Sequence, residues 1–341
     1  MSARNVEKPY RVLLAGSTVV AGIALSLLVG VTSSKASEWE FRGMCNASAV
    51  ELLNDTTIVV ANDEDNILRT YDLEGNGNPI GELDLDVFLK ADGEVDFEAS
   101  TSVGGTIYYI TSHGRNKKGN RKLDRYRFLA TQIDPSSDTP TLHAVDTPYL
   151  ALVEDMIASS ELQALDIASV SRLEEEKMKD LAPKKAGLNI EGMSRSRDGK
   201  ALYIGLRNPT QKGRAVIVVL ENPADIVSGS QTAKFAKPIY IDLNGLGIRS
   251  MTFVDERDAF YIVAGSGKSK VDHSVLYTWD GAGGPVAIKG PLQGNPEAMA
   301  YLPNKKQLLI LSDDGAIEEQ GQECKDHPET SKKFRGYVVD I

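Results

Sequence analysis

The chain has 341 residues and a formal net charge of −10, with 41% hydrophobic and 25% charged residues. This composition is typical of a globular protein with a large core, and it excludes a mainly disordered chain. The acidic balance argues against nucleic acid and anionic membrane surfaces as partners.

The N-terminal segment differs from the rest of the chain. Basic residues within the first eleven positions precede a mostly apolar run over 12–31, and small residues follow up to Ala36. This order is typical of a secretory signal, so we predict a signal peptide at 1–36 and a mature chain, 37–341, exported to a periplasm or secreted. The alternative is an uncleaved anchor, since a run of about twenty apolar residues can span a bilayer. Only then would a membrane be a partner.

Export changes how the two cysteines, Cys45 and Cys324, are interpreted. An oxidising compartment allows them to pair, and the bridge would join the two ends of the mature chain. On the chain-entropy estimate such a bridge stabilises the fold by at most about 5 kcal/mol. Two independent buried thiols are the alternative interpretation.

A pattern of a short run, a turn and a strongly apolar strand recurs along the mature chain. Its copies begin at Cys45, Asp96, Asn189, Ile248 and Pro296. Each copy is followed by a further candidate strand, at 67–73, 125–133, 215–220, 275–279 and 336–341. Units of three or four antiparallel strands that repeat about every fifty residues predict a β-propeller, an all-β fold. The segment 38–42 is expected to add the fourth strand of the last blade.

One interval between copies is longer than the others and contains the segment 150–182. This segment mixes leucines with the charge run "RLEEEKMKDL", which indicates helix rather than four strands. We therefore predict five blades with a helical insertion, and six blades as the alternative.

Several motifs resemble a known family. They include "LNIEGM", "IGLRNP", "AVIVVLENP" and "YYITSHGRNKKG". The resemblance runs from about Gly43 to the C-terminus and is to a bacterial family of exported proteins catalogued as a domain of unknown function. More distantly, the starts of the blades look like those of phytase-like, esterase-like propellers. The resemblance implies a propeller and no settled activity.

Equivalent positions of successive blades meet around the channel of a propeller, because the first strand of each blade lines it. The column of such positions holds Ala47 or Ser48, Glu98, Glu191, Arg249 and Glu297. The ends of the second strands supply Asp63, His113, Arg207 and Asp313, among others. Because first and second strands run antiparallel, both sets should lie at the same end of the channel.

The leading hypothesis for this end of the channel is a metal-assisted hydrolase of an ester or phosphoester. Carboxylates with oxygen-rich neighbours suit Ca²⁺, and the expected metal ligands are Glu98, Glu191 and Glu297. The catalytic candidates are Glu191, Glu297 and His113. The expected contacts to an anionic ligand are Arg207 and Arg249, with Asp63 and Asp313 as further ligand-binding candidates.

Two other interpretations remain open. A non-catalytic propeller could present the same end of the channel to a cationic or polyol small molecule, or to an envelope protein. Alternatively, the three glutamates bond backbone amides or Arg249 across the channel and hold the blades in register, since buried charges are usually paired. The sequence leaves open whether the chain is an enzyme, and a monomer is expected.

One basic segment, 114–122, stands out in this acidic chain. Its sequence, "GRNKKGNRK", fits a solvated hairpin loop, and the alternative is an anion-binding lip.

Overall fold

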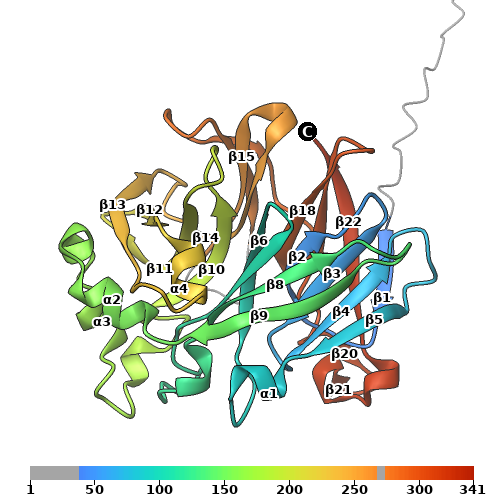
Figure 1. Cartoon of the computed structure of the whole chain (residues 1–341), viewed down its shortest axis with the longest axis horizontal. Coiled ribbons are helices and arrows are strands. Elements are labelled where there is room, and N and C mark those ends of the chain that lie inside the picture. The colour runs from blue at the N-terminus through green and yellow to red at the C-terminus, as the bar shows by residue number, and fades with distance from the viewer. Residues whose placement is uncertain (1–37, 267–272) are drawn as a thin grey trace, which may run out of the picture. The chain divides into compact units, whose positions relative to one another are not determined.

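Five four-stranded antiparallel sheets dominate the computed structural model, which describes residues 38–266 and 273–341 (Figure 1). The predicted signal peptide, 1–36, lies outside the described residues. Among the residues described, no helix is long and apolar enough to cross a membrane.

Each sheet is one blade, and its strands follow one another from the channel outwards. Blade 1 is β2 (Ala47–Leu52), β3 (Thr57–Asn62), β4 (Ile67–Asp72) and β5 (Pro79–Asp84). Blade 2 is β6 (Phe97–Val103), β7 (Thr106–Thr111), β8 (Phe128–Asp134) and β9 (Thr141–Tyr149). Blade 3 is β10 (Asn189–Arg195), β11 (Leu202–Gln211), β12 (Arg214–Leu220) and β13 (Phe235–Ile241). Blade 4 is β14 (Gly247–Val254), β15 (Ala259–Gly265), β16 (Val275–Trp279) and β17 (Val286–Lys289).

Blade 5 combines the two ends of the described chain. It contains β18 (Pro296–Leu302), β19 (Gln307–Ser312), β22 (Lys333–Asp340) and, outermost, β1 (Glu38–Arg42). Strand β1 runs antiparallel to β22, with Glu38 opposite Tyr337. The prediction that 38–42 completes the last blade is therefore confirmed, as is the five-bladed propeller.

Burial explains the strand sequences. All six residues of β3, "TIVVAN", are buried because neighbouring blades cover both faces of a second strand. The outer strand β5 instead alternates between half-buried and exposed residues, and all four residues of β17 are exposed. Apolar runs therefore mark the second strands, while the outer strands carry a weaker pattern.

The hydrophobic core is divided among the five contacts between neighbouring blades. One cluster joins blades 5 and 1 and contains Phe41, Tyr71 and Phe334, whose rings stack or meet edge to face. The other clusters join blades 1 and 2, 2 and 3, 3 and 4, and 4 and 5. Because every blade is packed on both sides, the ring is closed.

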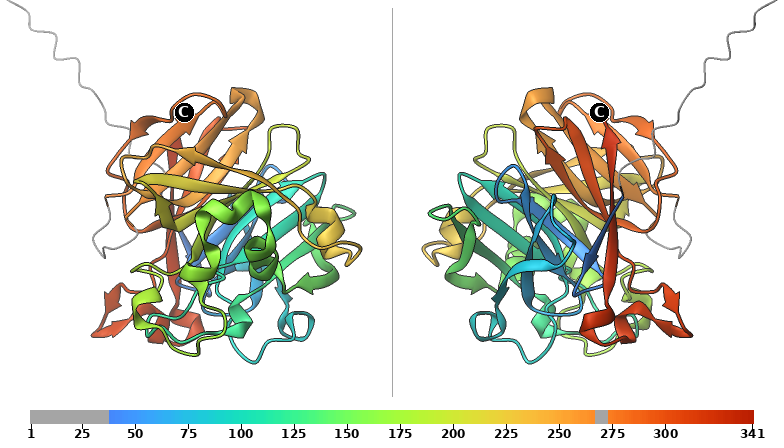
Figure 2. Two further views of the ribbon diagram at one scale, coloured as in Figure 1. Left: turned by 90° about the vertical axis from the view of Figure 1, so that its left-hand side faces the viewer. Right: turned by 90° about the vertical axis from the view of Figure 1, so that its right-hand side faces the viewer.

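The segment between β9 and β10 forms short helices instead of one long helix. They are α2 (Leu152–Ala158), η2 (Ser160–Leu165), α3 (Ile167–Ser171) and η3 (Lys179–Leu181). Buried side chains such as Leu152, Met156 and Leu162 pack into the cluster that joins blades 2 and 3. The helices thus lie against the outer part of these blades, as the left view of Figure 2 shows.

The remaining short elements lie in connections between strands. They are α1 (Asp86–Leu89), η1 (Leu123–Arg125), α4 (Pro223–Val227), η4 (Asp255–Arg257), η5 (Cys324–Asp326), η6 (Glu329–Ser331) and the hairpin β20 (Glu318–Glu319) with β21 (Gln322–Glu323). The sequence places the start of the third strand of blade 2 at Arg125, but β8 begins at Phe128 because η1 occupies residues 123–125.

Gly192 is explained by the packing of blade 3 on blade 4. A Cβ on Gly192 or on Gly205 would lie 2.6 Å from Cγ2 of Ile248. The corresponding positions of blades 2 and 5 hold Ala99 and Ala298, which are buried with a Cβ in place. The glycine therefore serves one contact between blades and not the repeat as a whole.

Candidate functional site

The innermost strand of every blade has a β-bulge at the same place. In β10, Ile190 lies opposite Leu206 and Gly192 lies opposite Gly205, so that Glu191 is the extra residue. The extra residues of the five blades are Ser48, Glu98, Glu191, Arg249 and Glu297. A bulge re-aims a side chain out of the regular alternation of a strand. The column predicted from the repeat is therefore a column of bulged residues.

These bulges meet at one end of the channel. The innermost strands contact one another in the closed order β2, β6, β10, β14, β18 and back to β2. We call this end, with the adjoining ends of the second strands, the channel mouth. In Figure 1, α1 and the hairpin β20–β21 lie toward the same end of the blades.

Glu191 lies in a network of buried partners on the side of blades 3 to 5. Nη1 of Arg207 donates to Oε1 of Glu191 at 2.5 Å, and Nδ2 of Asn189 donates to the same oxygen at 2.7 Å. Nε of Arg249 lies 3.6 Å from Oε2 of Glu191. All four side chains are buried. Glu191 is thus neutralised by two guanidinium groups.

Arg249 extends this network to blade 5. Its Nη2 donates to Oε1 of Glu297, and its Nη1 donates to Oδ1 of Asn295 at 2.9 Å. Nδ2 of Asn295 donates to Oδ2 of Asp313 at 2.8 Å. Arg249 therefore links the ring carboxylates of blades 3 and 5, as the interpretation of blades held in register predicts.

Glu98 has a different environment on the side of blades 1 and 2. Among the residues described, no hydrogen bond or ion pair reaches its carboxylate, and the side chain is half-buried. Burial and the nearby charge of Asp96 raise the pKa of Glu98 well above its usual value. Glu98 is thus a carboxylate whose charged form is poorly stabilised.

The carboxylates around Glu98 have the same property. Nδ2 of Asn46 donates to Oδ1 of Asp63 at 2.8 Å, yet burial and the charge of Asp313 raise the pKa of Asp63 well above its usual value. Burial also raises the pKa of Asp313. Burial raises the pKa of Asp96 to about 6, although Nη1 of Arg125 donates to it at 2.6 Å. This side of the channel mouth has an excess of negative charge.

Lys184 is a residue of the channel mouth that the repeat does not predict. It follows η3 in the insertion and is exposed. Partial burial and the positive charge of Arg207 lower its pKa, and Glu191, Arg249 and Asp313 act on it as well. The sequence offers no signal for this placement because the insertion lies outside the repeat.

His113 is buried in the wall of blade 2. Its Nδ1 lies 2.8 Å from the carbonyl oxygen of Thr111, so Nδ1 carries the proton and donates. Burial lowers the pKa of His113 to about 4, which leaves the ring neutral at pH 7. Arg249 joins Glu191 and Glu297, whereas His113 has no hydrogen bond or ion pair with either among the described residues.

Two of the three expected metal ligands have other partners. Glu191 and Glu297 are paired with arginines, and among the described residues only Glu98 has no ion pair. Within 38–266 and 273–341, no group of three or more Asp, Glu, His or Cys side chains is arranged to hold a metal ion. The described residues therefore give no support to the Ca²⁺ site.

The predicted disulfide between Cys45 and Cys324 is confirmed. It lies beside the channel mouth, since the amide of Asp314 donates to the carbonyl oxygen of Cys45 at 2.9 Å and Asn46 forms an isolated β-bridge with Asp313. The bridge thereby joins the start of blade 1 to the excursion between β19 and β22.

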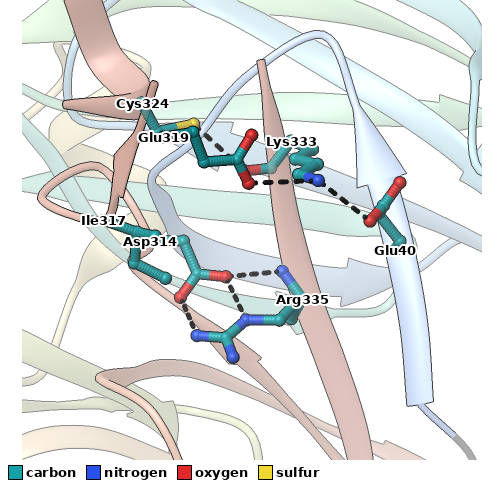
Figure 3. A pocket seen from close by; sticks show the side chains of 7 residues that line it. All are labelled: Glu40, Asp314, Ile317, Glu319, Cys324, Lys333 and Arg335. Atoms are coloured by element: carbon teal, nitrogen blue, oxygen red, sulfur yellow. Dashed lines mark hydrogen bonds and ion pairs between the residues drawn. The ribbon is translucent and has the colours of Figure 1, made fainter. Parts of the chain in front are cut away.

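A hollow of about 150 Å³ is lined in part by Cys324 of this disulfide (Figure 3). Its charged side chains are paired with one another. Nζ of Lys333 lies 3.4 Å from Glu40 and 3.1 Å from Glu319, and Nε of Arg335 donates to Asp314 at 2.7 Å. Because Lys333 and Arg335 are already paired with carboxylates, this hollow is not a candidate site for a charged ligand.

Comparisons with known proteins bear on fold more than on activity. Similar solved structures are a luciferin-regenerating enzyme (TM-score 0.40, 8% identity, covering 89% of this chain and 96% of that chain), the Cps50 (Swd1) β-propeller domain of Myceliophteria thermophila (0.37, 11%, 87% and 97%) and Kuenenia stuttgartiensis hydrazine synthase (0.38, 12%, 88% and 88%). These values carry no argument about function, and the five blades rest on the strand pairing itself. No curated protein matches the chain. Residues 170–314 match a family model described as "Protein of unknown function (DUF3616)", which is the kind of family that the sequence motifs predict.

Proposed function

We propose that this protein is an exported, non-catalytic binding propeller whose channel mouth binds a small organic cation. The single observation that carries the proposal is Glu98. It is one of the bulged ring residues, it has no hydrogen bond or ion pair among the described residues, and its pKa is raised well above the usual value. A cation at this place would supply the missing counter-charge.

The surrounding carboxylates support a cationic ligand over an anionic one. Asp63, whose charge acts on Glu98, has a raised pKa, as does Asp313, whose charge acts on Asp63, and Asp96 shares Arg125 with Glu94. The arginines expected to bind an anion, Arg207 and Arg249, are engaged with ring carboxylates. An anion would therefore have to displace buried ion pairs, whereas a cation would meet unpaired negative charge.

Binding has more support than hydrolysis. A general base must lie within hydrogen-bond reach of its substrate or nucleophile and have a suitable pKa. His113 is buried and neutral, and the ring carboxylates of blades 3 and 5 are paired with arginines. A carboxylate cluster of raised pKa can instead gain a cation and release protons as it does so.

Export is part of the proposal. The disulfide supports it, because disulfides persist in oxidising compartments outside the cytosol. The predicted cleavage after Ala36 and the mature chain 37–341 belong to the same proposal, with a periplasmic or secreted location.

Isothermal titration with spermidine at low salt tests the proposal. We expect saturable binding at pH 6 with release of protons, seen as a heat that changes with the ionisation enthalpy of the buffer. Glu98→Gln should weaken binding at least about tenfold, or about 1.4 kcal/mol. Glu256→Gln removes an exposed carboxylate in η4 and should leave binding unchanged.

Two outcomes would contradict the cation site. One is no binding of spermidine, arginine methyl ester or tetramethylammonium by the folded protein. The other is saturable binding of Ca²⁺ in place of these cations, which would return the metal-assisted hypothesis to first place.

A further inference from the structure

A cavity of about 340 Å³ is lined by five side chains, all of them lysines. They are Lys117, Lys118, Lys177, Lys179 and Lys185. The first two belong to the loop between β7 and β8, and the other three belong to the insertion between β9 and β10. The fold thus brings together positive charges that lie far apart in the sequence of an acidic protein.

Backbone hydrogen bonds hold the two segments together. Asn120 and Lys177 form an isolated β-bridge, and the amide of Met178 donates to the carbonyl oxygen of Gly119 at 2.9 Å. Gly119 has φ +78°, and a Cβ there would lie 2.5 Å from the carbonyl oxygen of Met178. Only glycine therefore allows this close approach.

Arg115 stabilises the same contact between the loop and the insertion. Its side chain is buried, and its Nη2 donates to the carbonyl oxygens of Arg172 at 2.5 Å and Glu175 at 2.7 Å. Its Nη1 donates to the carbonyl oxygen of Gly119 at 3.2 Å. The buried guanidinium of Arg115 thus holds the loop against the insertion. The five lysines therefore lie on two segments that are fixed relative to each other.

The lysines have little counter-charge in the protein. Among the described residues, Lys185 has one weak contact, with its Nζ 3.8 Å from the exposed carboxylate of Asp180, and the other four lysines have no ion pair. Two of the carboxylates close in sequence have arginine partners, since Glu176 pairs with Arg121 and Glu175 pairs with Arg172. This is the opposite of the hollow beside the disulfide, where every lysine and arginine has a carboxylate partner.

We propose that this lysine cavity binds a compact anion that carries several phosphate groups. Ammonium groups are strong phosphate binders that act as point charges, and the cavity offers no planar guanidinium fork for carboxylates. Among the described residues, no aromatic side chain lines the cavity to stack on a base. A volume of about 340 Å³ lies at the lower end of the range of ligand pockets, which suits a few linked phosphates.

The occupant is a free soluble anion and not a polymer or a surface. The chain as a whole carries a charge of −10, so an extended polyanion or an anionic bilayer would meet repulsion beyond the cavity. A compact ligand stays within reach of the five lysines. This site does not depend on the cation site at the channel mouth, and either can fail alone.

Titration calorimetry with inorganic tripolyphosphate tests the proposal on the full chain. We expect saturable binding, much tighter than that of orthophosphate and weaker at higher salt because of screening. The double variants Lys117→Gln/Lys118→Gln and Lys177→Gln/Lys179→Gln should each weaken binding about tenfold, or about 1.4 kcal/mol. Since these side chains are exposed, circular dichroism should show an unchanged fold.

The matched control is Lys237→Gln/Lys289→Gln, which removes two exposed lysines from the outer strands β13 and β17. Binding should be unchanged in this variant. Equal loss in the control, or equal affinity for orthophosphate and tripolyphosphate, would show unspecific attraction and overturn the proposal. Binding to phosphatidylglycerol vesicles that depends on the same four lysines, without binding of free tripolyphosphate, would also overturn it.

Discussion

Blades 3 to 5 and blades 1 and 2 contribute different charges to the same ring of bulged residues. Glu191 and Glu297 lie beside Arg207 and Arg249, which neutralise them through buried ion pairs. Glu98 occupies the equivalent place in blade 2 and has no such partner among the described residues. The same bulged position can therefore hold a carboxylate that is ion-paired with a neighbouring blade or one that has no ion pair. Which of the two occurs depends on the side chains that reach it from neighbouring blades.

The largest effect on stability is expected from removing Arg249, which pairs with both Glu191 and Glu297. Arg249→Met leaves the carboxylates of Glu191 and Glu297 buried without this guanidinium, and breaking a buried pair in this way costs about 3–5 kcal/mol. Urea unfolding measures the loss. The control Arg257→Met removes an exposed arginine of the same blade and should cost well under about 1 kcal/mol. Equal losses of unfolding free energy in both variants would contradict a stabilising role for the ion pairs of Arg249.

A pH-dependent effect is expected from His113 on the acidic side. Its pKa is lowered from 6.5 to about 4, so below pH 6.5 the unfolded state takes up a proton that the folded state does not. Stability is therefore lost as the pH falls from 6.5 to about 4, by about 3 kcal/mol at about 1.4 kcal/mol per unit. His113→Asn removes this loss, and asparagine tolerates the positive φ at this position.

Chemical denaturation of the wild type and of His113→Asn at several pH values checks this prediction. The carboxyl of Asp96, with its pKa raised to about 6, acts in the opposite direction and favours the folded state as the pH falls. Because Asp96 is present in both proteins, the difference between them isolates the histidine. A difference that stays constant from pH 7 to pH 4 would contradict the prediction.

Charge removal at the two kinds of ring carboxylate should have opposite signs. Burial and the charge of Asp96 raise the pKa of Glu98, so ionising this carboxyl costs more in the folded state than in the unfolded state and lowers stability at pH 7. Glu98→Gln should therefore stabilise the protein at pH 7, because it removes this cost. Glu297→Gln should destabilise it, because it breaks the pair with Arg249. Thermal unfolding at pH 7 compares them, and effects of the same sign would remove the distinction between the two sides.

The smallest effect on stability is expected at Lys184. Its side chain is exposed, so Lys184→Gln should change the free energy of unfolding by no more than about 0.5 kcal/mol. Loss of this positive charge should nevertheless tighten spermidine binding at the channel mouth a few-fold. Lys185→Gln, at the neighbouring residue, should leave spermidine binding unchanged. Equal effects of the two changes on spermidine binding would place Lys184 outside the site.

The repeat was enough to predict the ring but not its charge pairing. Apolar second strands recur because both of their faces are buried, so the blades and the column with Glu98, Glu191 and Glu297 follow from the sequence. Which residue pairs with Glu191 depends on the reach of Arg207 and Arg249 between blades. The sequence left open whether Arg249 binds an anion or pairs with the glutamates, and it suggested only an anion contact for Arg207. The bulges are a backbone feature without a residue signature of their own.

The lysine cavity shows a second limit of sequence reasoning. The basic segment 114–122 is evident in the sequence and could be interpreted either as a solvated loop or as an anion-binding lip. The other half of the cavity, Lys177, Lys179 and Lys185, lies in or after a mixed charge run and has no local pattern. Only the tertiary contact through Asn120 and Arg115 brings the halves together.

The strand order of blade 5 has a consequence for biosynthesis. Strand β1 precedes all other described strands, but its partner β22 follows them all in the chain. While a chain is still being made, β1 and β19 each present an open hydrogen-bonding edge, and such edges can recruit other chains. The native ring can therefore assemble only after Lys333–Asp340 has been translated, which makes synthesis of β22 a checkpoint for folding.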